Sequence, residues 1–426
     1  MMNRFAVFTR PSIVGTTFAA FVLMHGVSGV PYAASKMEDV LHVPVSPHFA
    51  PVLGLSFLLY TLGAVFMAGV VEFDLRKSQL VFFRRPAPAM VNLGLRLLAA
   101  LVVLASITWL YALAAERTGI EMLVTTAREY FELVDFRIAQ TEENPYHYVS
   151  VLCSDTFAPI ALMCALNIAR AERTLLSWVV VCIAVGVGVV SATRDLHKAP
   201  LIFLALFCVL SRFMTTTRTN VVRPGFVLRV CGIIGGLGLL GYYITYELRA
   251  SEAAVWTVNR LVLAPQVGVD SFLFVYPYIL PFNHGLGIGL VGRVFGWQYF
   301  RNPPAEVAFI MTGNLHTTFN AFWSTEMWAS FGYAGVVIGS FVVGAVLCGL
   351  DAWLLRRRRT SAACVMYAFL IIASVRGMST SFFTTLLSGG LVLGPLFLMF
   401  LTGRLKRDEL AAAGKAVTGR HPVEAT

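Results

Sequence analysis

Long apolar runs alternate with short polar segments along the whole chain. Most runs extend for about 17–25 residues, the length that an α-helix needs to cross a hydrocarbon core of roughly 30 Å. The pattern predicts about ten transmembrane helices. They are expected near Ser12–Val30, Phe49–Val71, Met90–Ala115, Val149–Ile168, Leu175–Val190, Ala199–Met214, Gly225–Thr245, Ala329–Leu350, Ala362–Ser374 and Phe382–Leu401. We therefore expect residues 1–426 to form a single all-α, polytopic membrane domain.

The composition favours a membrane protein over a soluble one. Hydrophobic residues make up 57% of the chain and charged residues only 13%, and the mean hydropathy is +0.73. A soluble domain carries about 25% charged residues, so too little charge is present to solvate a globule of this size. All seven cysteines fall inside predicted helices at no metal-ligand spacing. We therefore expect neither a disulfide framework nor a zinc site.

The formal charge of +10 is distributed in a way that predicts orientation rather than nucleic-acid binding. Basic residues occur in short clusters between apolar runs, and no basic stripe with interleaved aromatic residues is found. Because cytoplasmic loops are enriched in Lys and Arg, alternate clusters predict that both chain ends are cytoplasmic. The cytoplasmic clusters are Arg76, Lys77, Arg84 and Arg85; Arg170 and Arg173; Arg212, Arg218 and Arg223; Arg356 to Arg359; and Arg404, Lys406 and Arg407.

Three segments are not expected to cross the membrane. Residues 246–328 are expected to form a large outer, periplasmic loop. A crossing by the apolar stretch Leu261–Pro281 would move the four-arginine cluster outside, and Pro265, Asp270 and Pro277 make this stretch a poor spanning helix. Residues 116–148 have apolar positions at helical spacing, which predicts an amphipathic helix on the outer interface. Residues 408–426 are expected to be a disordered cytoplasmic tail.

Cations on the predicted outer side are the main chemical signal. They include Arg194, Lys198, Arg249, Arg260 and Arg376. A cation near the bilayer needs an acid or a bound anion as its partner. One interpretation is ordinary pairing with acids, among them Asp155, which lies inside the outer edge of the fourth predicted helix. The other is convergence on an anionic lipid diphosphate, whose oxygens match the planar donor fork of arginine.

A polar segment before the eighth predicted helix supplies candidate acid–base groups. His316 and Asn320 are four residues apart, so both would lie on one face of a helix. Glu326 is a carboxylate at the membrane edge and is our first candidate for a general base. His316 is the second candidate, although a solvated loop histidine fits the same pattern. Gly332 and Gly335 are expected to allow close helix packing.

Three stretches resemble bacterial oligosaccharide repeat-unit polymerases of the O-antigen and exopolysaccharide type. They are the outer turn Thr193-Arg194-Asp195-Leu196-His197-Lys198-Ala199-Pro200-Leu201, the stretch Asn259-Arg260-Leu261-Val262-Leu263-Ala264-Pro265, and the segment from Asn320 to Gly335. In the last of these the family commonly has Asp where this chain has Glu326. Arginine–glycine spacings found in some members are missing after Arg194 and Arg260.

The resemblance implies a helical glycosyltransferase fold of the kind that uses polyprenyl-linked donors (GT-C-like). Such an enzyme joins undecaprenyl-diphosphate-linked repeat units into O-antigen, capsule or exopolysaccharide at the outer face of the bacterial inner membrane, which is therefore the expected location. We assign Arg194, Lys198, Arg260 and Arg376 to the departing diphosphate, Glu326 or His316 to the acceptor hydroxyl and Asn320 to a sugar hydroxyl. Arg249 and Asp155 complete the candidate substrate site. No metal or other cofactor is expected, because arginines can take the place of the metal.

Further expectations concern partners and sugar contacts. Membrane lipid, a chain-length regulator and a flippase are candidate partners besides the lipid-linked glycan. Aromatic side chains could stack on sugars or pack within the protein. They are Trp256, Trp297, Tyr299, Trp323 and Trp328.

Two other functions stay open at this point. One is the related O-antigen ligase type of lipid-linked glycosyltransferase, whose histidine-containing motif is loosely matched by His316-Thr317. The other is a polysaccharide flippase or secondary transporter. Transporters usually show repeated halves and helices broken at the midplane, whereas this sequence shows no internal symmetry and concentrates its polar residues toward the outer side.

Overall fold

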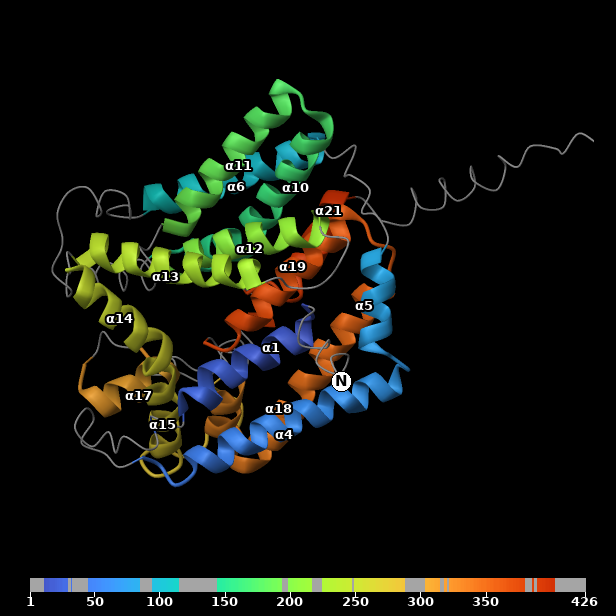
Figure 1. Ribbon diagram of the computed structural model, residues 1–426. Coiled ribbons are helices and arrows are strands. Elements are labelled where there is room, and N and C mark those ends of the chain that lie inside the picture. The colour runs from blue at the N-terminus through green and yellow to red at the C-terminus, as the bar shows by residue number, and fades with distance from the viewer. Residues whose placement is uncertain are drawn as a thin grey trace, which may run out of the picture.

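The architecture is described from a computed structural model (Figure 1). The described residues are 11–29, 32, 45–84, 94–114, 144–193, 198–216, 224–246, 249–287, 303–314, 318–319, 322–379, 385–386 and 389–402. All regular elements in these ranges are helices. The predicted tail and residues 116–143 of the predicted amphipathic segment lie outside the described residues, and His147 already belongs to the next long helix.

Seven helical segments in the described ranges are long and apolar enough to cross a membrane. They are α4 (Phe49–Val70), α6 (Gly94–Ala114), the continuous run of α9 (His147–Leu152), η3 (Cys153–Phe157) and α10 (Ala158–Glu172), α11 (Leu175–Thr193), α12 (Lys198–Thr216), α13 (Pro224–Tyr246) and α18 (Trp323–Leu355). Large apolar side chains such as Leu95, Leu175 and Leu228 point outward from this bundle. Such an apolar surface is expected of a multi-pass membrane protein.

Three further apolar helices are shorter. They are α1 (Ile13–Phe21), which continues into the π-helix η2 (Val22–Val27); α19 (Ser361–Arg376); and α21 (Leu393–Thr402). All three were predicted as spans, but the last begins later than expected from the apolar run. Residues 389–392 are not helical, and Gly390 has φ +86° where it lies against Thr156 and Phe369. The ten residues of α21 therefore cover only about 15 Å.

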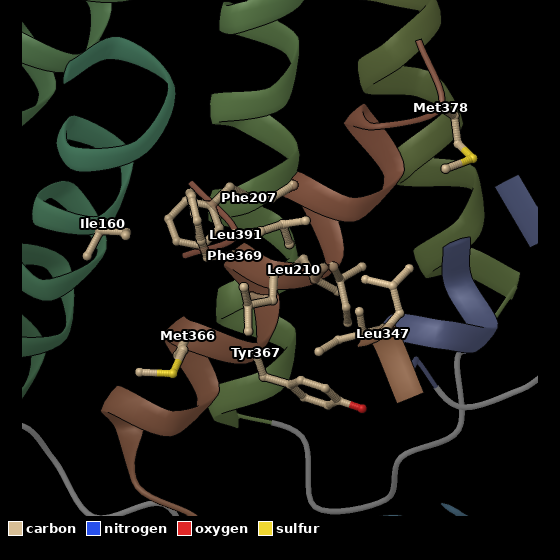
Figure 2. Close-up of a cluster of buried hydrophobic side chains, with 14 of the residues drawn as sticks. Ile160, Phe207, Leu210, Leu347, Met366, Tyr367, Phe369, Met378 and Leu391 are labelled. Atoms are coloured by element: carbon tan, nitrogen blue, oxygen red, sulfur yellow. The ribbon is translucent and has the colours of Figure 1, made fainter. Parts of the chain in front are cut away.

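The helix α19 lies at the centre of the bundle. It contacts α1, α10, α12, α18 and α21, and its residues are apolar on all sides, as expected for a helix surrounded by other helices. Figure 2 shows the surrounding cluster of buried side chains. The cluster includes Phe369, Tyr367 and Met366 of α19, Phe207 and Leu210 of α12, Ile160 of α10 and Leu347 of α18. This packing fixes the position of Arg376 at the C-terminus of α19.

One end of the bundle, called here the Arg359 end, gathers basic segments that are far apart in sequence. The Arg359 guanidinium is buried and donates to the carbonyl oxygens of Phe83 (2.7 Å) and Met214 (2.6 Å). Phe83 belongs to the amphipathic helix α5 (Leu75–Arg84) and Met214 to the last turn of α12. Several of the basic residues that were predicted to be cytoplasmic are therefore brought to one end.

The opposite end, the Arg376 end, contains the transverse helices α14 (Ala250–Val262), α15 (Ala264–Val275) and α17 (Pro303–Thr312). In Figure 1, α14 and α15 run across the ends of the long helices rather than along them. The two are bent by 41° relative to each other at Leu263. The helix α15 contacts η2 and the first turns of α4 and α18. The stretch from Leu261 to Pro281 is thus not one straight helix. Together, α14 and α15 are long and apolar enough to form a bent span or a re-entrant segment, so the outer position of residues 246–328 stays a prediction.

The helix α18 contains a hairpin at Gly332. Trp323 Nε1 donates to Ser340 Oγ at 3.2 Å, whereas residues 17 apart in a straight helix are separated by about 25 Å. Gly332 has φ +59° and ψ −140°, a conformation that reverses the chain. The short arm of the hairpin (residues 323–331) therefore returns along the long arm (residues 333–355). Gly335 allows this approach because it packs on the carbonyl of Met327, so the prediction of close packing there is confirmed.

Replacing Gly332 by alanine is expected to lower the free energy of unfolding by about 2–3 kcal/mol. The backbone conformation is strained for any residue with a Cβ atom, and the new methyl would lie 2.9 Å from Phe282 Cζ. Unfolding in mixed micelles would measure the loss. The matched control is Gly349→Ala in the same helix, where the nearest atom is 3.9 Å away. Equal stability of the two variants would contradict the hairpin.

Candidate functional site

An ion pair between Asp155 and Arg376 marks the candidate site at the Arg376 end. Arg376 Nη2 lies 2.6 Å from Asp155 Oδ2, and the exposed fractions of the two side chains are 20% for Arg376 and 2% for Asp155. Ser154 Oγ donates to the other carboxylate oxygen at 3.0 Å. The pair lines a hollow bounded by α10, α12 and α19. Its walls are Ser154, Pro159, Pro200, Phe203, Leu204, Phe207, Phe369, Ile372, Ala373 and Gly389.

Local sequence explains how both charges reach this hollow. Pro159 lacks an N–H group, and its ring would clash with the carbonyl of residue 155 in a regular α-helix. The chain adopts the π-helical turn η3 at Cys153–Phe157 instead, and Asp155 lies in that turn. Arg376 occupies the last turn of α19, where the helix dipole favours a cation. π-Turns of this kind are frequent at functional sites.

The first turns of α12 form another wall of the hollow. Pro200 and Phe203 belong to α12, and the Phe203 ring centroid lies 5.8 Å from the Arg376 guanidinium carbon. Lys198 is the first residue of α12, but its side chain and all of Arg194 lie outside the described residues. The structure thus brings Asp155 and Arg376 together next to the first turns of α12, the helix that begins at Lys198.

The remaining predicted site residues lie elsewhere or cannot be placed. Arg249 and Arg260 are exposed on α14 and are not among the described residues that line the hollow. Glu326 is half-buried on the short arm of the hairpin, where its amide donates to the Phe322 carbonyl at 3.1 Å. His316 and Asn320 lie outside the described residues. A joint role of these five residues with Arg376 in one site stays a prediction.

The predicted sugar-stacking residues divide in the same way. Trp323 and Trp328 are 0% and 2% exposed, so both pack inside the protein and the packing interpretation holds for them. Trp256 is 52% exposed on α14. Trp297 and Tyr299 lie outside the described residues.

A buried histidine that the sequence analysis missed lies near the same end of α19. His25 is in the π-helix η2, and its Nε2 atom is 3.3 Å from the Met378 carbonyl oxygen. Its ring stacks on Phe322 at a centroid distance of 4.4 Å. Both π-turns of the described chain therefore face the C-terminal end of α19. The only sequence signal was a single histidine in an apolar run.

Glu306 is a second residue that was not singled out. It lies half-buried on α17, and burial raises the pKa of its carboxyl group. A carboxyl group whose pKa is raised is a candidate for proton transfer. Among the described residues, no group of three His, Cys, Asp or Glu side chains could hold a metal ion.

Comparison with known proteins identifies no relative: no family model, no curated protein and no solved structure matches this chain. The geometry of the site and the membrane architecture are therefore the basis for any functional proposal.

Proposed function

We propose that this protein is a glycosyltransferase that joins lipid-linked oligosaccharide repeat units at the outer face of the bacterial inner membrane. The observation that carries the proposal is the Asp155–Arg376 ion pair that lines a hollow at one end of an apolar helical bundle. The predicted orientation makes this end extracytoplasmic, where polyprenyl-diphosphate-linked sugars are polymerised. The resemblance of three sequence stretches to repeat-unit polymerases supports the same assignment.

The proposed reaction forms a bond between an acceptor hydroxyl oxygen and the donor's anomeric carbon. The bond from that carbon to the diphosphate oxygen breaks, and undecaprenyl diphosphate leaves with the electron pair. Arg376, with Arg194 and Lys198 of the predicted outer turn, would stabilise the developing negative charge. Glu326, with His316 as second candidate, would accept the proton of the acceptor hydroxyl. Asp155 would hold the Arg376 guanidinium in position.

The test is deletion of the gene followed by gel analysis of the surface glycan. We expect the ladder of polymer lengths to collapse to one repeat unit. Complementation with Arg376→Gln should fail, with about a 10²–10³-fold loss of polymer synthesis. Arg357→Gln at the Arg359 end is the matched control, because Arg357 is an exposed arginine at the end of α18, and it should restore the ladder.

A double variant separates a catalytic role of Arg376 from a structural one. Removing one partner of a buried ion pair costs about 3–5 kcal/mol, and neutralising both partners avoids an uncompensated charge. If Arg376 only balances Asp155, Asp155→Asn with Arg376→Gln restores polymerisation. If Arg376 binds the diphosphate, the double variant reaches normal levels in the membrane and still makes single repeats. An intact ladder in the deletion strain removes the proposal altogether.

A polysaccharide flippase or secondary transporter is the second candidate. The specific observation in its favour is that regular α-helix gives way to π-turns at η2 and η3 and that the chain reverses at Gly332, because transporters bind substrates at irregular helices. Its deletion phenotype differs. Loss of a flippase leaves repeat units on the cytoplasmic side, so not even a single repeat would appear at the surface.

A further inference from the structure

Three side chains from separate elements form a connected cluster at the Arg376 end, called here the aromatic platform. It consists of His48, Tyr278 and Tyr333. His48 Nε2 lies 2.7 Å from the Tyr278 hydroxyl, and His48 Nδ1 lies 2.9 Å from the Tyr333 hydroxyl. The exposed fractions of the tyrosines are 61% for Tyr278 and 39% for Tyr333. The platform is therefore an accessible surface with its polar groups held in fixed positions.

The platform rests on a rigid base. Trp328 is buried beneath it, with its ring centroid 5.1 Å from His48 and 5.0 Å from Tyr333. Trp328 Nε1 donates to the Tyr276 carbonyl at 2.8 Å. The loop that carries Tyr278 is fixed to the short arm of the hairpin by hydrogen bonds from the Asn283 and His284 amides to the Ala329 and Ser330 carbonyls. A site held in this way loses little conformational entropy when a ligand binds.

The hydrogen-bonding capacity of the platform does not depend on the histidine tautomer. A neutral imidazole has one N–H donor and one acceptor nitrogen. One tyrosine hydroxyl therefore donates to His48, and the other accepts from His48 and keeps its own proton for a ligand. The platform thus presents one hydroxyl donor and several oxygen lone pairs beside exposed ring faces. Sugar rings match this arrangement, because they combine C–H faces with neighbouring hydroxyl groups that both donate and accept.

We propose that the aromatic platform binds an uncharged sugar ring of the glycan substrate, a proposal that rests on the proposed function. The three side chains include no carboxylate, lysine or arginine, so they suit a neutral sugar rather than the diphosphate. Tyrosines that only anchor a protein at the membrane interface need a polar tip in water. They do not need two hydroxyls fixed on one imidazole.

The experiment measures binding of the free repeat-unit oligosaccharide, released by mild acid from the lipid-linked intermediates of the source strain. Saturation-transfer NMR with the full-length protein in nanodiscs gives the Kd. Tyr278→Ala is expected to weaken binding about tenfold, and Tyr278→Phe and Tyr333→Phe about threefold each. Tyr243→Phe is the matched control, because Tyr243 is 57% exposed on α13 and lies outside the platform, and it should leave the Kd unchanged.

Thermal unfolding of each variant identifies any that fail to fold, and the phenylalanine variants keep the test valid in that case. Absence of binding by the wild-type protein, or an unchanged Kd in the folded tyrosine variants, would overturn the platform. If the deletion strain nevertheless shows a collapsed ladder, the proposed polymerase function stands and only the sugar-binding role of the platform is rejected. Conversely, if binding depends on Tyr278 but the ladder in the deletion strain is intact, the polymerase function is rejected and the platform remains a glycan-binding surface.

Discussion

Replacing Asp351 by alanine is expected to lower the free energy of unfolding by about 3–5 kcal/mol, the largest loss that we predict for one side chain. Asp351 is 0% exposed and accepts hydrogen bonds from the Ile13 amide (2.9 Å), the Val14 amide (2.8 Å) and the Tyr367 hydroxyl (2.7 Å). Alanine would leave the two amides without an acceptor, and the Tyr367 hydroxyl would keep only its 3.5 Å contact with the Pro11 carbonyl. The loss should appear as a lower transition midpoint when the protein is unfolded in mixed micelles.

The position of Asp351 at the start of α1 explains the size of this effect. The first four amides of a helix have no partner within the helix. In α1 the first two donate to Asp351, and the next two donate to Ser12 Oγ and to the Ser12 carbonyl. A carboxylate of α18 thus caps the buried N-terminus of α1, 338 residues away in sequence.

A graded series of variants tests this interpretation. Tyr367→Phe removes one of the three hydrogen bonds and should cost about 1 kcal/mol. Asp74→Ala is the matched control: Asp74 accepts from the Lys77 amide at 2.9 Å but is exposed, so its loss should cost no more than about 1 kcal/mol. If Asp351→Ala were no more harmful than Asp74→Ala, buried capping would not be what holds α1 in place.

Alanine at Gly63 or Gly344 is expected to destabilise the protein by about 2–3 kcal/mol, and valine by more. A Cβ atom at Gly63 would overlap the Phe341 carbonyl, and one at Gly344 would overlap the Tyr60 carbonyl. Both neighbours are backbone atoms, so α4, which contains Gly63 and Tyr60, would have to separate from α18, which contains Gly344 and Phe341. Small residues allow this close approach in membrane helices, where packing replaces the hydrophobic effect as the attraction between helices.

Two other glycines of α4 serve as controls. A methyl group added at Gly54 or Gly69 of α4 would have no atom within 4 Å of it, so alanine there should leave stability unchanged or raise it slightly because alanine favours helix formation. The measurement is again the unfolding midpoint in mixed micelles. Equal behaviour of Gly54→Ala and Gly63→Ala would show that α4 and α18 do not pack as described.

Helix positions followed well from sequence because apolar runs of sufficient length must form helices in lipid. The positions at which helices break were not predictable from the sequence. The predicted span Ala329–Leu350 contains the hairpin at Gly332, since hydropathy is the same whether a chain continues or reverses. The break at Gly390 was missed for a similar reason: the flanking residues are apolar, and only contacts with Thr156 and Phe369 require a non-helical turn there.

The candidate site was only partly accessible from sequence. Asp155 and Arg376 were each singled out as charges near the predicted outer edge. Pairing of the outer cations with acids such as Asp155 was one of the two interpretations, and it holds for Arg376, but the sequence did not indicate which cation would pair with Asp155. They are 221 residues apart, and the π-turn that contains Asp155 adds one residue and thereby rotates the helix by about 100°. His48, Tyr278 and Tyr333 lie in three separate segments with no shared motif, so only their arrangement in space identifies them as a cluster.

The parallel packing of α4 on the long arm of α18 has a consequence for biosynthesis. His48 contacts Tyr333 and Val71 contacts Arg356, each pair separated by 285 residues, so the two helices remain in one register along their length. At about 5–20 residues per second, α4 emerges from the ribosome roughly 15–60 s before its partner. During that interval its glycine face meets lipid or an insertion factor, and the mature bundle closes only when translation is nearly complete.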